Sequence, residues 1–159
     1  MKNILIILGT RPEAIKMAPL FHELKTRPGL KVSLCSTGQR KDMIDEVFKI
    51  FDFYPDVSLD IMKNNQDLFD ITSSILVKLK KVISNLDPDL ILVHGDTSST
   101  FAGALAAFYC KKRVGHVEAG LRTHNLKAPY PEELNRKFAG LVSDLHFSPT
   151  DESKKNLID

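Results

Sequence analysis

The chain contains few cysteines and no long apolar run. Two cysteines among 159 residues are too few for a disulfide framework, and the spacing of Cys35 and Cys110 matches no metal-binding pair. Both lie in apolar stretches, which predicts buried free thiols in a reducing compartment. The apolar run at residues 4–8 is too short for a signal peptide, and no run approaches the roughly 20 apolar residues of a membrane-spanning helix. We therefore expect a cytoplasmic protein with no membrane partner.

Neither sign of charge dominates the sequence. The 22 basic residues are nearly balanced by 20 acidic ones, which gives a formal net charge of +2. Nucleic-acid-binding proteins usually concentrate basic residues on one face, whereas the longest basic cluster here, residues 78–81, lies inside a helical pattern that indicates a solvated surface. The balance therefore argues against a nucleic-acid partner. With 43% hydrophobic and 26% charged residues, a disordered or collagen-like chain is also excluded.

Apolar segments of strand and helix type alternate along the chain, separated by short breaks. This alternation predicts an α/β fold with a doubly wound, Rossmann-like parallel sheet that helices cover on both faces, in one domain over residues 1–159. The predicted strands are residues 4–8, 31–36, 57–61, 90–93, 114–117 and 145–147. The predicted helices are residues 13–26, 43–51, 68–86, 101–109, 132–142 and 151–157. The second of these helices is expected to turn Met43, Val47, Ile50 and Phe51 inward, and Pro19 is expected to kink the first.

Polar residues follow the first predicted strand, and in a fold of this kind ligands bind outside the carboxyl ends of the strands. The segment holds Gly9, Arg11 and Pro12, with Lys16 one turn further on. It is explained either by a well-capped turn or by an anion site at a helix N-terminus, and Arg11 at the mouth of the turn favours the anion site. With one glycine, the segment is not the dinucleotide-binding fingerprint.

The fourth and fifth predicted strands are also followed by polar residues, namely His94, Asp96 and Glu118. Helix capping alone would account for Asp96, but it does not require His94 and Asp96 on either side of a glycine. Glu118 directly follows a buried strand, where a charged side chain needs a partner. An internal ion pair with Arg122 is one explanation of Glu118, and a functional carboxylate is the other.

The fifth predicted helix begins with a proline and two acids, the first of which is Glu132. Taken alone, this is favourable helix-start chemistry that needs no function. Together with Asp96 and Glu118, however, Glu132 completes a set of three carboxylates in loops at one edge of the sheet, near Arg11. Such a set suits general acid–base chemistry on a substrate that carries phosphate. The single histidines are not spaced as metal ligands, so no metal is predicted.

Several runs of the sequence resemble those of the non-hydrolysing UDP-N-acetylglucosamine 2-epimerases. The resemblance rests on residues 9–19 (GTRPEAIKMAP), 93–97 (VHGDT), 106–109 (AAFY), 115–123 (GHVEAGLRT), 131–136 (PEELNR) and 146–150 (HFSPT). It extends over essentially the whole chain. Long ungapped motifs of this kind do not arise by chance.

The resemblance implies the N-terminal half of an enzyme with two similar α/β domains in a glycosyltransferase-B-like architecture, with the active site in the cleft between them. Such enzymes interconvert UDP-N-acetylglucosamine and UDP-N-acetylmannosamine for cell-surface polysaccharide biosynthesis. They need no metal or nicotinamide cofactor, because they eliminate UDP across C1–C2 and add it back with the opposite configuration. Family members are expected to be homodimers. We expect the second, UDP-binding domain to lie outside this chain, and the chain alone to be inactive.

The resemblance also carries roles to particular positions. Asp96, Glu118 and Glu132 match the catalytic carboxylates of the family. The candidate residues for binding UDP-N-acetylglucosamine or UDP are Arg11, Lys16, His94, Arg122 and Arg136.

One departure from the family pattern concerns regulation. Where the family commonly has Gln-His before its second helix, this chain has Gln39 and Arg40, followed by Lys41 and Asp42. In bacterial members this region helps to hold a second, regulatory molecule of UDP-N-acetylglucosamine, so the change predicts weak or absent activation by it. Two other interpretations stay open: a hydrolysing epimerase or related glycosyltransferase domain, and a non-catalytic remnant or subunit that only binds a partner.

Overall fold

The apolar, β-branched segments of the chain form a parallel sheet. The computed structural model describes residues 1–38 and 41–158, and within these ranges the sheet has six strands in the order β3-β2-β1-β4-β5-β6. The strands are β1 (Lys2–Leu8), β2 (Leu30–Ser36), β3 (Val57–Ser58), β4 (Leu90–His94), β5 (Arg113–Val117) and β6 (Leu145–Phe147). The helices are α1 (Arg11–Thr26), α2 (Lys41–Ile50), α3 (Leu68–Leu86), α4 (Ser98–Tyr109), α5 (Glu132–Val142) and α6 (Asp151–Ile158). The predicted fold class is confirmed.

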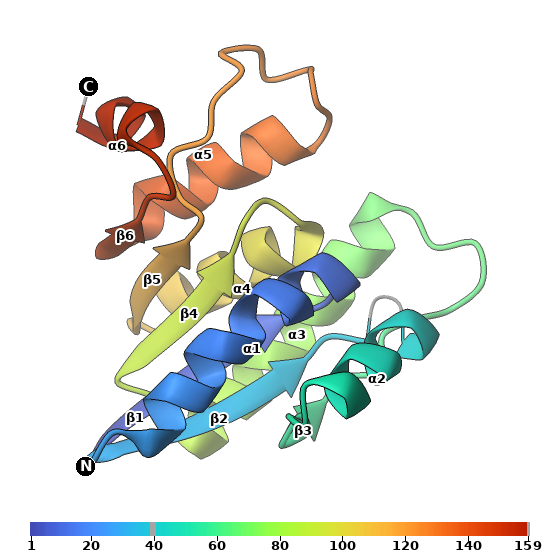
Figure 1. Cartoon of the computed structure of the whole chain (residues 1–159). Coiled ribbons are helices and arrows are strands. Elements are labelled where there is room, and N and C mark those ends of the chain that lie inside the picture. The colour runs from blue at the N-terminus through green and yellow to red at the C-terminus, as the bar shows by residue number, and fades with distance from the viewer. Residues whose placement is uncertain (39–40, 159) are drawn as a thin grey trace.

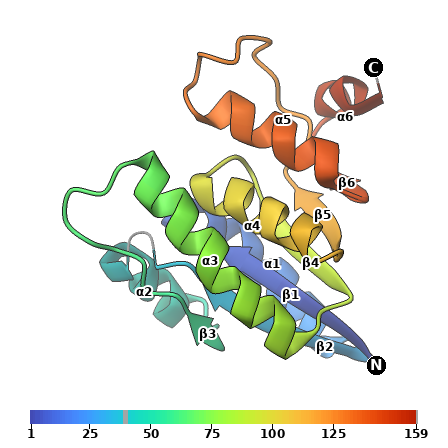
Figure 2. The same ribbon diagram turned by 180° about the vertical axis from the view of Figure 1, so that it is seen from behind.

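Both faces of the sheet are covered, because β1 sends alternate side chains to opposite sides. Leu5 and Ile7 pack in a core with side chains of α3 and α4, whereas Ile4, Ile6 and Leu8 pack in a second core with those of α1 and α2. Figure 1 shows α1 and α2 on one face, and Figure 2 shows α3 and α4 on the other. Burying one such aliphatic side chain contributes about 1.5–3 kcal/mol. The unbroken apolar run of β1 is therefore the signature of a central strand.

The strand order reverses between β1 and β4. From β1 the chain moves outward to β2 and β3, returns to pair β4 with the other side of β1, and continues to β5 and β6. All pairs are parallel. The loops after β1 and β4 therefore diverge at the carboxyl edge of the sheet, which is where ligands bind in doubly wound folds.

The second helix is rotated from its predicted orientation. Its buried side chains are Ile44, Val47 and Phe48, whereas Met43 is 45% and Ile50 71% exposed. The prediction that Met43 and Ile50 face the core is therefore wrong. The orientation depends on a tertiary contact, because Phe48 packs edge-on against the buried Phe53 with ring centroids 5.1 Å apart. This contact turns the row of side chains that contains Phe48 towards the core.

Other boundaries also differ from those predicted. Strand β3 ends at Ser58, because Asp60 adopts a left-handed conformation with φ 45° that breaks the extended run, although Ile61 is still buried. Helix α4 begins three residues earlier than predicted, since the Thr97 side chain caps it by accepting a hydrogen bond from the Thr100 amide at 3.2 Å. Helix α1 continues through Pro19.

The two cysteines are free, and they differ in environment. Cys35 is buried, and burial raises the pKa of its thiol to about 12, whereas Cys110 is only half-buried. Over the described ranges, no helix has both the length and the apolar character that crossing a membrane requires.

Candidate active site

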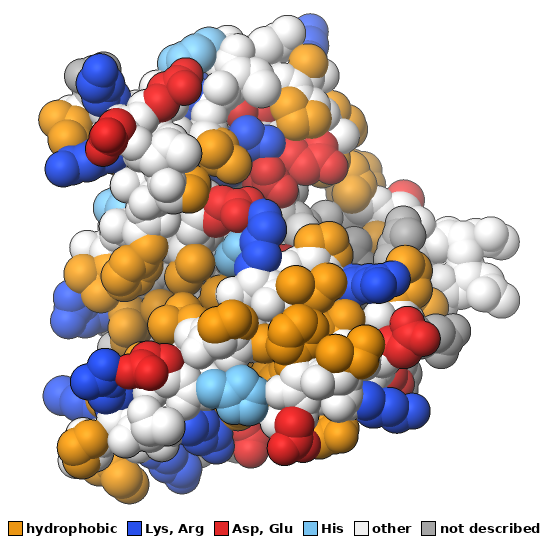
Figure 3. All heavy atoms as spheres, in the orientation of Figure 1, with side chains coloured by type: hydrophobic (Ala, Val, Ile, Leu, Met, Phe, Trp, Pro, Cys, Tyr) orange, Lys and Arg blue, Asp and Glu red, His pale blue; other side chains and the backbone are white. Residues whose placement is uncertain are grey.

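The loops after β1 and β4 meet the start of α5 around one cavity. Its volume is about 530 Å3, and Arg11, Asp96, Glu132, Asn135 and Met43 are among its lining residues. The space-filling view of Figure 3 shows acidic side chains gathered beside lysine and arginine side chains in the middle of this face, between the parts that carry α1 and α5. The exposed Met43, misplaced in the sequence prediction, is thus a wall of this cavity. The structure brings Arg11, Asp96 and Glu132 together, as expected.

Gly9 allows the loop after β1 to lie against the start of α4. A Cβ atom at this position would lie 2.1 Å from Ser99 Oγ and 2.3 Å from Thr37 Oγ1. No side chain fits at such distances, so the close approach of this loop to the start of α4 requires a glycine.

Glu118, directly after β5, carries its carboxylate to Lys16 of α1. Lys16 Nζ lies 2.5 Å from Glu118 Oε2, and His94 Nε2 lies 3.6 Å from the same oxygen. Of the two explanations of Glu118 that the sequence left open, the ion pair with Arg122 is therefore wrong. Glu118 also has a positive φ of 61°. A non-glycine residue in this conformation is strained by roughly 1–3 kcal/mol, and such residues cluster at functional sites.

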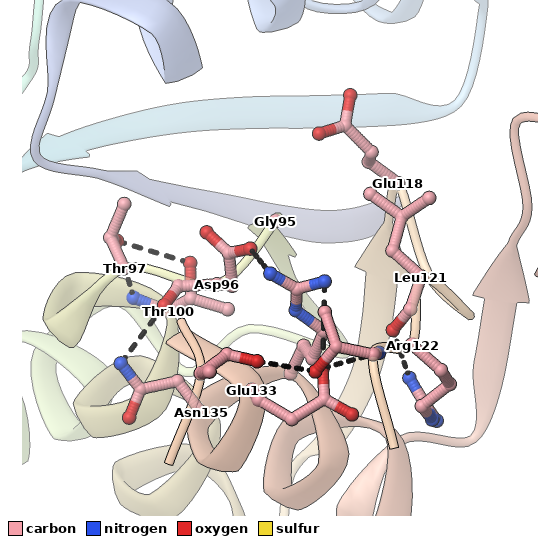
Figure 4. A network of polar contacts seen from close by, with 12 residues as sticks. Gly95, Asp96, Thr97, Thr100, Glu118, Leu121, Arg122, Glu133 and Asn135 are labelled. Atoms are coloured by element: carbon pink, nitrogen blue, oxygen red, sulfur yellow. Dashed lines mark hydrogen bonds and ion pairs between the residues drawn. The ribbon is translucent and has the colours of Figure 1, made fainter. Parts of the chain in front are cut away.

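Asp96 is held from several directions (Figure 4). Arg136 Nη2 lies 2.7 Å from Asp96 Oδ2, and the Asn135 side-chain amide donates to the Asp96 carbonyl at 2.9 Å. On the preceding residue, the Gly95 amide donates to the Val117 carbonyl at 2.9 Å. The position of the Asp96 carboxylate is therefore fixed by β5 and α5 as well as by its own loop.

Two groups of the site have shifted proton affinities. Burial raises the pKa of Asp96, the charges of Glu132 and Glu118 raise it further, and Arg136 opposes them. Burial lowers the pKa of His94, and Lys16 adds to this effect while Glu118 opposes it. His94 is thus favoured as a neutral side chain, whereas Asp96 holds its proton more tightly than an exposed aspartate would.

Glu13 was not predicted as a site residue, yet it links the loop after β1 to the loop after β4. Its buried carboxylate accepts hydrogen bonds from the Gly9 and Thr10 amides at 2.9 and 2.7 Å, and from the Thr97 and Thr100 hydroxyls at 2.7 and 3.2 Å. These two amides are therefore not available to bind an anion, because the chain supplies its own carboxylate. Burial nevertheless raises the pKa of Glu13. Thr10 followed three residues later by Glu13 is a capping-box pattern, which could have revealed this role.

The remaining candidates lie in different surroundings. Arg11 is exposed at the rim of the cavity. Arg122 donates to the Leu121 carbonyl at 2.8 Å, lies beside Gly140 of α5, and is not among the residues that line the cavity. Burial lowers the pKa of Arg122. Gln39 and Arg40 lie outside the described residues.

In the part of the chain that the structure describes, no group of three or more histidine, cysteine, aspartate or glutamate side chains could hold a metal ion.

His116 on β5 predicts a pH-dependent stability. Its Nε2–H donates to the Gly95 carbonyl at 2.7 Å, and Nδ1 has no hydrogen-bond partner among residues 1–38 and 41–158. A second proton would therefore lie at a buried nitrogen without an acceptor, and burial lowers the pKa from 6.5 to about 4. Since the unfolded chain binds this proton more readily, the contribution of His116 is fully present above pH 6.5 and is lost towards pH 4.

We expect His116→Gln, whose amide can still donate to Gly95, to remove most of this dependence. The loss of unfolding free energy between pH 7 and pH 4 should be about 3 kcal/mol smaller than in the unaltered chain. Urea unfolding at the two pH values measures it, with the exposed His124→Gln as control. Equal losses in all three proteins would show that His116 is not responsible.

The fold and the site together define a Rossmann-like α/β domain. Its carboxylates and cations cluster at the carboxyl edge of the sheet, where the strand order reverses between β1 and β4. A sequence model of the family described as UDP-N-acetylglucosamine 2-epimerase matches residues 22–159, and the chain belongs to this family.

Relatives and solved structures agree with this assignment. The UDP-N-acetylglucosamine 2-epimerase of Bacillus subtilis is 52% identical over 156 residues, which cover 98% of this chain and 41% of that protein. That of Campylobacter jejuni is 51% identical over 157 residues, covering 99% of this chain and 41% of that protein. The crystal structure of UDP-GlcNAc 2-epimerase from Neisseria meningitidis bound to UDP-GlcNAc superposes with a TM-score of 0.95 at 49% identity, over 98% of this chain and 42% of that chain.

The chain therefore spans about two fifths of the length of these relatives and corresponds to their N-terminal part. The solved neighbours are epimerases of glycosyltransferase-B-like architecture. The predicted membership of the UDP-N-acetylglucosamine 2-epimerase family and the predicted N-terminal half are confirmed. The roles of the individual site residues stay predictions.

Proposed function

We propose that this chain supplies the catalytic carboxylates of a non-hydrolysing UDP-N-acetylglucosamine 2-epimerase, which interconverts UDP-N-acetylglucosamine and UDP-N-acetylmannosamine. The names of the curated relatives and the UDP-GlcNAc bound to the Neisseria protein support the substrate class. The observation that carries the proposal is the gathering of Asp96, Glu118 and Glu132 with Lys16 and Arg136 at one edge of the sheet.

Inversion at C2 of the sugar requires more than a base. The C2 hydrogen is not next to a carbonyl, so its removal gives no stabilised anion. Elimination avoids this difficulty: a carboxylate takes the C2 proton, the electron pair forms the C1–C2 double bond, and the C1–O bond breaks to release UDP. UDP then adds back, and a proton returns to the opposite face of C2. The reaction needs acid–base groups on two sides of C2 and cations at the leaving pyrophosphate.

The described side chains suit these tasks. Asp96 and Glu132 line the same cavity and are assigned the two proton transfers. The raised pKa of Asp96 brings its proton affinity closer to working pH, which favours proton transfer. Glu118 holds Lys16 at 2.5 Å and so orients a cation for the departing pyrophosphate, with Arg11 exposed at the rim. No step in this scheme uses a metal or a cofactor.

The part of the relatives beyond this chain completes the site in this proposal. A single domain leaves the cavity open to water, which screens Arg11 and Lys16 from the leaving group. The binding energy of the uridine and phosphates, which positions the sugar, comes from the second domain. We therefore propose that the chain alone is inactive. From the resemblance to the family and from the sequence, we also propose that the complete protein is a homodimer and that it works in the cytoplasm.

The test is to fuse this chain to the C-terminal part of the Bacillus subtilis relative. We expect the fusion to convert UDP-N-acetylglucosamine into UDP-N-acetylmannosamine, and the chain alone to form no product, as followed by 1H NMR. Release of free N-acetylmannosamine by the fusion would favour a hydrolysing enzyme instead. Turnover by the chain alone would contradict the need for a second domain.

A further inference from the structure

Two adjacent acids at the start of α5 point in different directions. Glu132 lines the cavity, whereas Glu133 is fully buried, with 0% of its surface exposed. A buried carboxylate is costly unless charged or hydrogen-bonded groups surround it. The family assignment and the proposed proton transfers give Glu133 no task, so its contacts are of interest.

Glu133 ties the loop after β5 to α5. Its Oε2 accepts a hydrogen bond from the Thr123 amide at 3.1 Å, and its Oε1 accepts one from the His124 amide at 3.2 Å. Arg136 Nη1 lies 3.6 Å from Glu133 Oε2. The two amides and the Arg136 cation come from two segments, so the carboxylate is held from both sides.

Arg136 lies between two carboxylates. Its Nη2 is 2.7 Å from Asp96 Oδ2, while its Nη1 faces Glu133, and only 11% of its side chain is exposed. Figure 4 shows Asp96 and Glu133 in this network, with the Glu118 carboxylate pointing away from it. Because a guanidinium is planar and rigid, fixing one nitrogen fixes the direction of the other.

We propose that Glu133 is a positioning residue: it holds Arg136 between two carboxylates, so that Asp96 receives an oriented hydrogen bond but only part of the positive charge. Glu133 touches no substrate, and its role rests on the proposed role of Asp96. An unshared arginine at this distance would stabilise the ionised aspartate strongly and make it a poor base. Burial, together with the charges of Glu132 and Glu118, already raises the pKa of Asp96 against the effect of Arg136, so the proposal rests on the placement of Arg136 between Asp96 and Glu133.

The test is a titration of the Asp96 carboxyl carbon by 13C NMR in this chain. We expect Glu133→Gln to lower the pKa of Asp96 by about one unit, because Arg136 then acts on Asp96 alone. Glu133→Asp, which keeps the charge, should give a smaller shift, and the exposed Glu152→Gln should give none. An unchanged or raised value in Glu133→Gln would overturn the proposal.

A second background shows whether Glu133 acts through Arg136. In a chain that already carries Arg136→Gln, the further change Glu133→Gln should shift the pKa of Asp96 much less than it does in the unaltered background. An equal shift in both backgrounds would overturn the proposal. Neither titration requires turnover, so failure of the proposed epimerase activity cannot be mistaken for failure here. In an active fusion, Glu133→Gln should lower kcat about tenfold with KM little changed, and an unchanged kcat would also overturn the proposal.

Discussion

Replacing Asp96 by asparagine is expected to lower the kcat of the active fusion roughly a thousandfold, since acid–base groups in proton transfer contribute about 10^2–10^4-fold. Asparagine keeps the size of the side chain but cannot take the C2 proton. The hydrogen bond from Asn135 to the backbone carbonyl of residue 96 remains, so the loop keeps its position. Because the proton is transferred only in the transition state, kcat and kcat/KM should fall together.

The matched control is Asp89→Asn. Asp89 lies just before β4, at the opposite edge of the sheet, where its carboxylate contacts Lys2 at 2.9 Å. This variant should keep the kcat of the unaltered fusion. Steady-state rates from UDP-N-acetylglucosamine measure both variants. If Asp96→Asn retained more than about a tenth of kcat, Asp96 would not be one of the two acid–base groups.

Replacing Glu13 by alanine is expected to lower the unfolding free energy of the chain by about 3 kcal/mol. The change leaves the Gly9 and Thr10 amides without their acceptor in a buried place, and it also removes a partner of the Thr97 and Thr100 hydroxyls. The hydroxyls can rotate towards other acceptors, because the His94 carbonyl also lies within hydrogen-bond distance of the Thr100 hydroxyl. The two amides cannot move without shifting the loop, so they dominate the cost.

Urea unfolding of the chain measures this effect. Glu46→Ala on the exposed side of α2 is the control, and it should change the unfolding free energy by no more than about 0.5 kcal/mol. Equal stability of the two variants would show that the Glu13 contacts do not hold the two loops together. A loss confined to Glu13→Ala would establish this carboxylate as the link between the loops after β1 and β4.

The features that the sequence predicted are those that local pattern determines. The unbroken apolar run of β1 indicated a strand buried on both faces, and the polar residues after β1, β4 and β5 indicated the edge at which the site lies. Asp96, Glu132 and Arg11 meet there because parallel strands bring their carboxyl ends together.

The features that the sequence did not predict depend on partners distant along the chain. Glu118 pairs with Lys16, which is 102 positions away. The sequence offered the nearby Arg122 as one possible partner, because spacing along the chain cannot show which cation the fold brings closest. Glu133 looked like one of two equivalent acids at a helix start, but its burial is set by the loop that folds over it. The orientation of α2 depended in the same way on a contact with Phe53.

Deuterium incorporation at C2 tests the central claim most directly. The active fusion is incubated with UDP-N-acetylglucosamine in deuterated water, and the C2 position is followed by 1H NMR. If carboxylates of this chain exchange the C2 proton during elimination and re-addition of UDP, the UDP-N-acetylmannosamine formed should carry deuterium at C2. Asp96→Asn should slow its formation roughly a thousandfold. Epimerised product that retains the original C2 hydrogen would contradict the account.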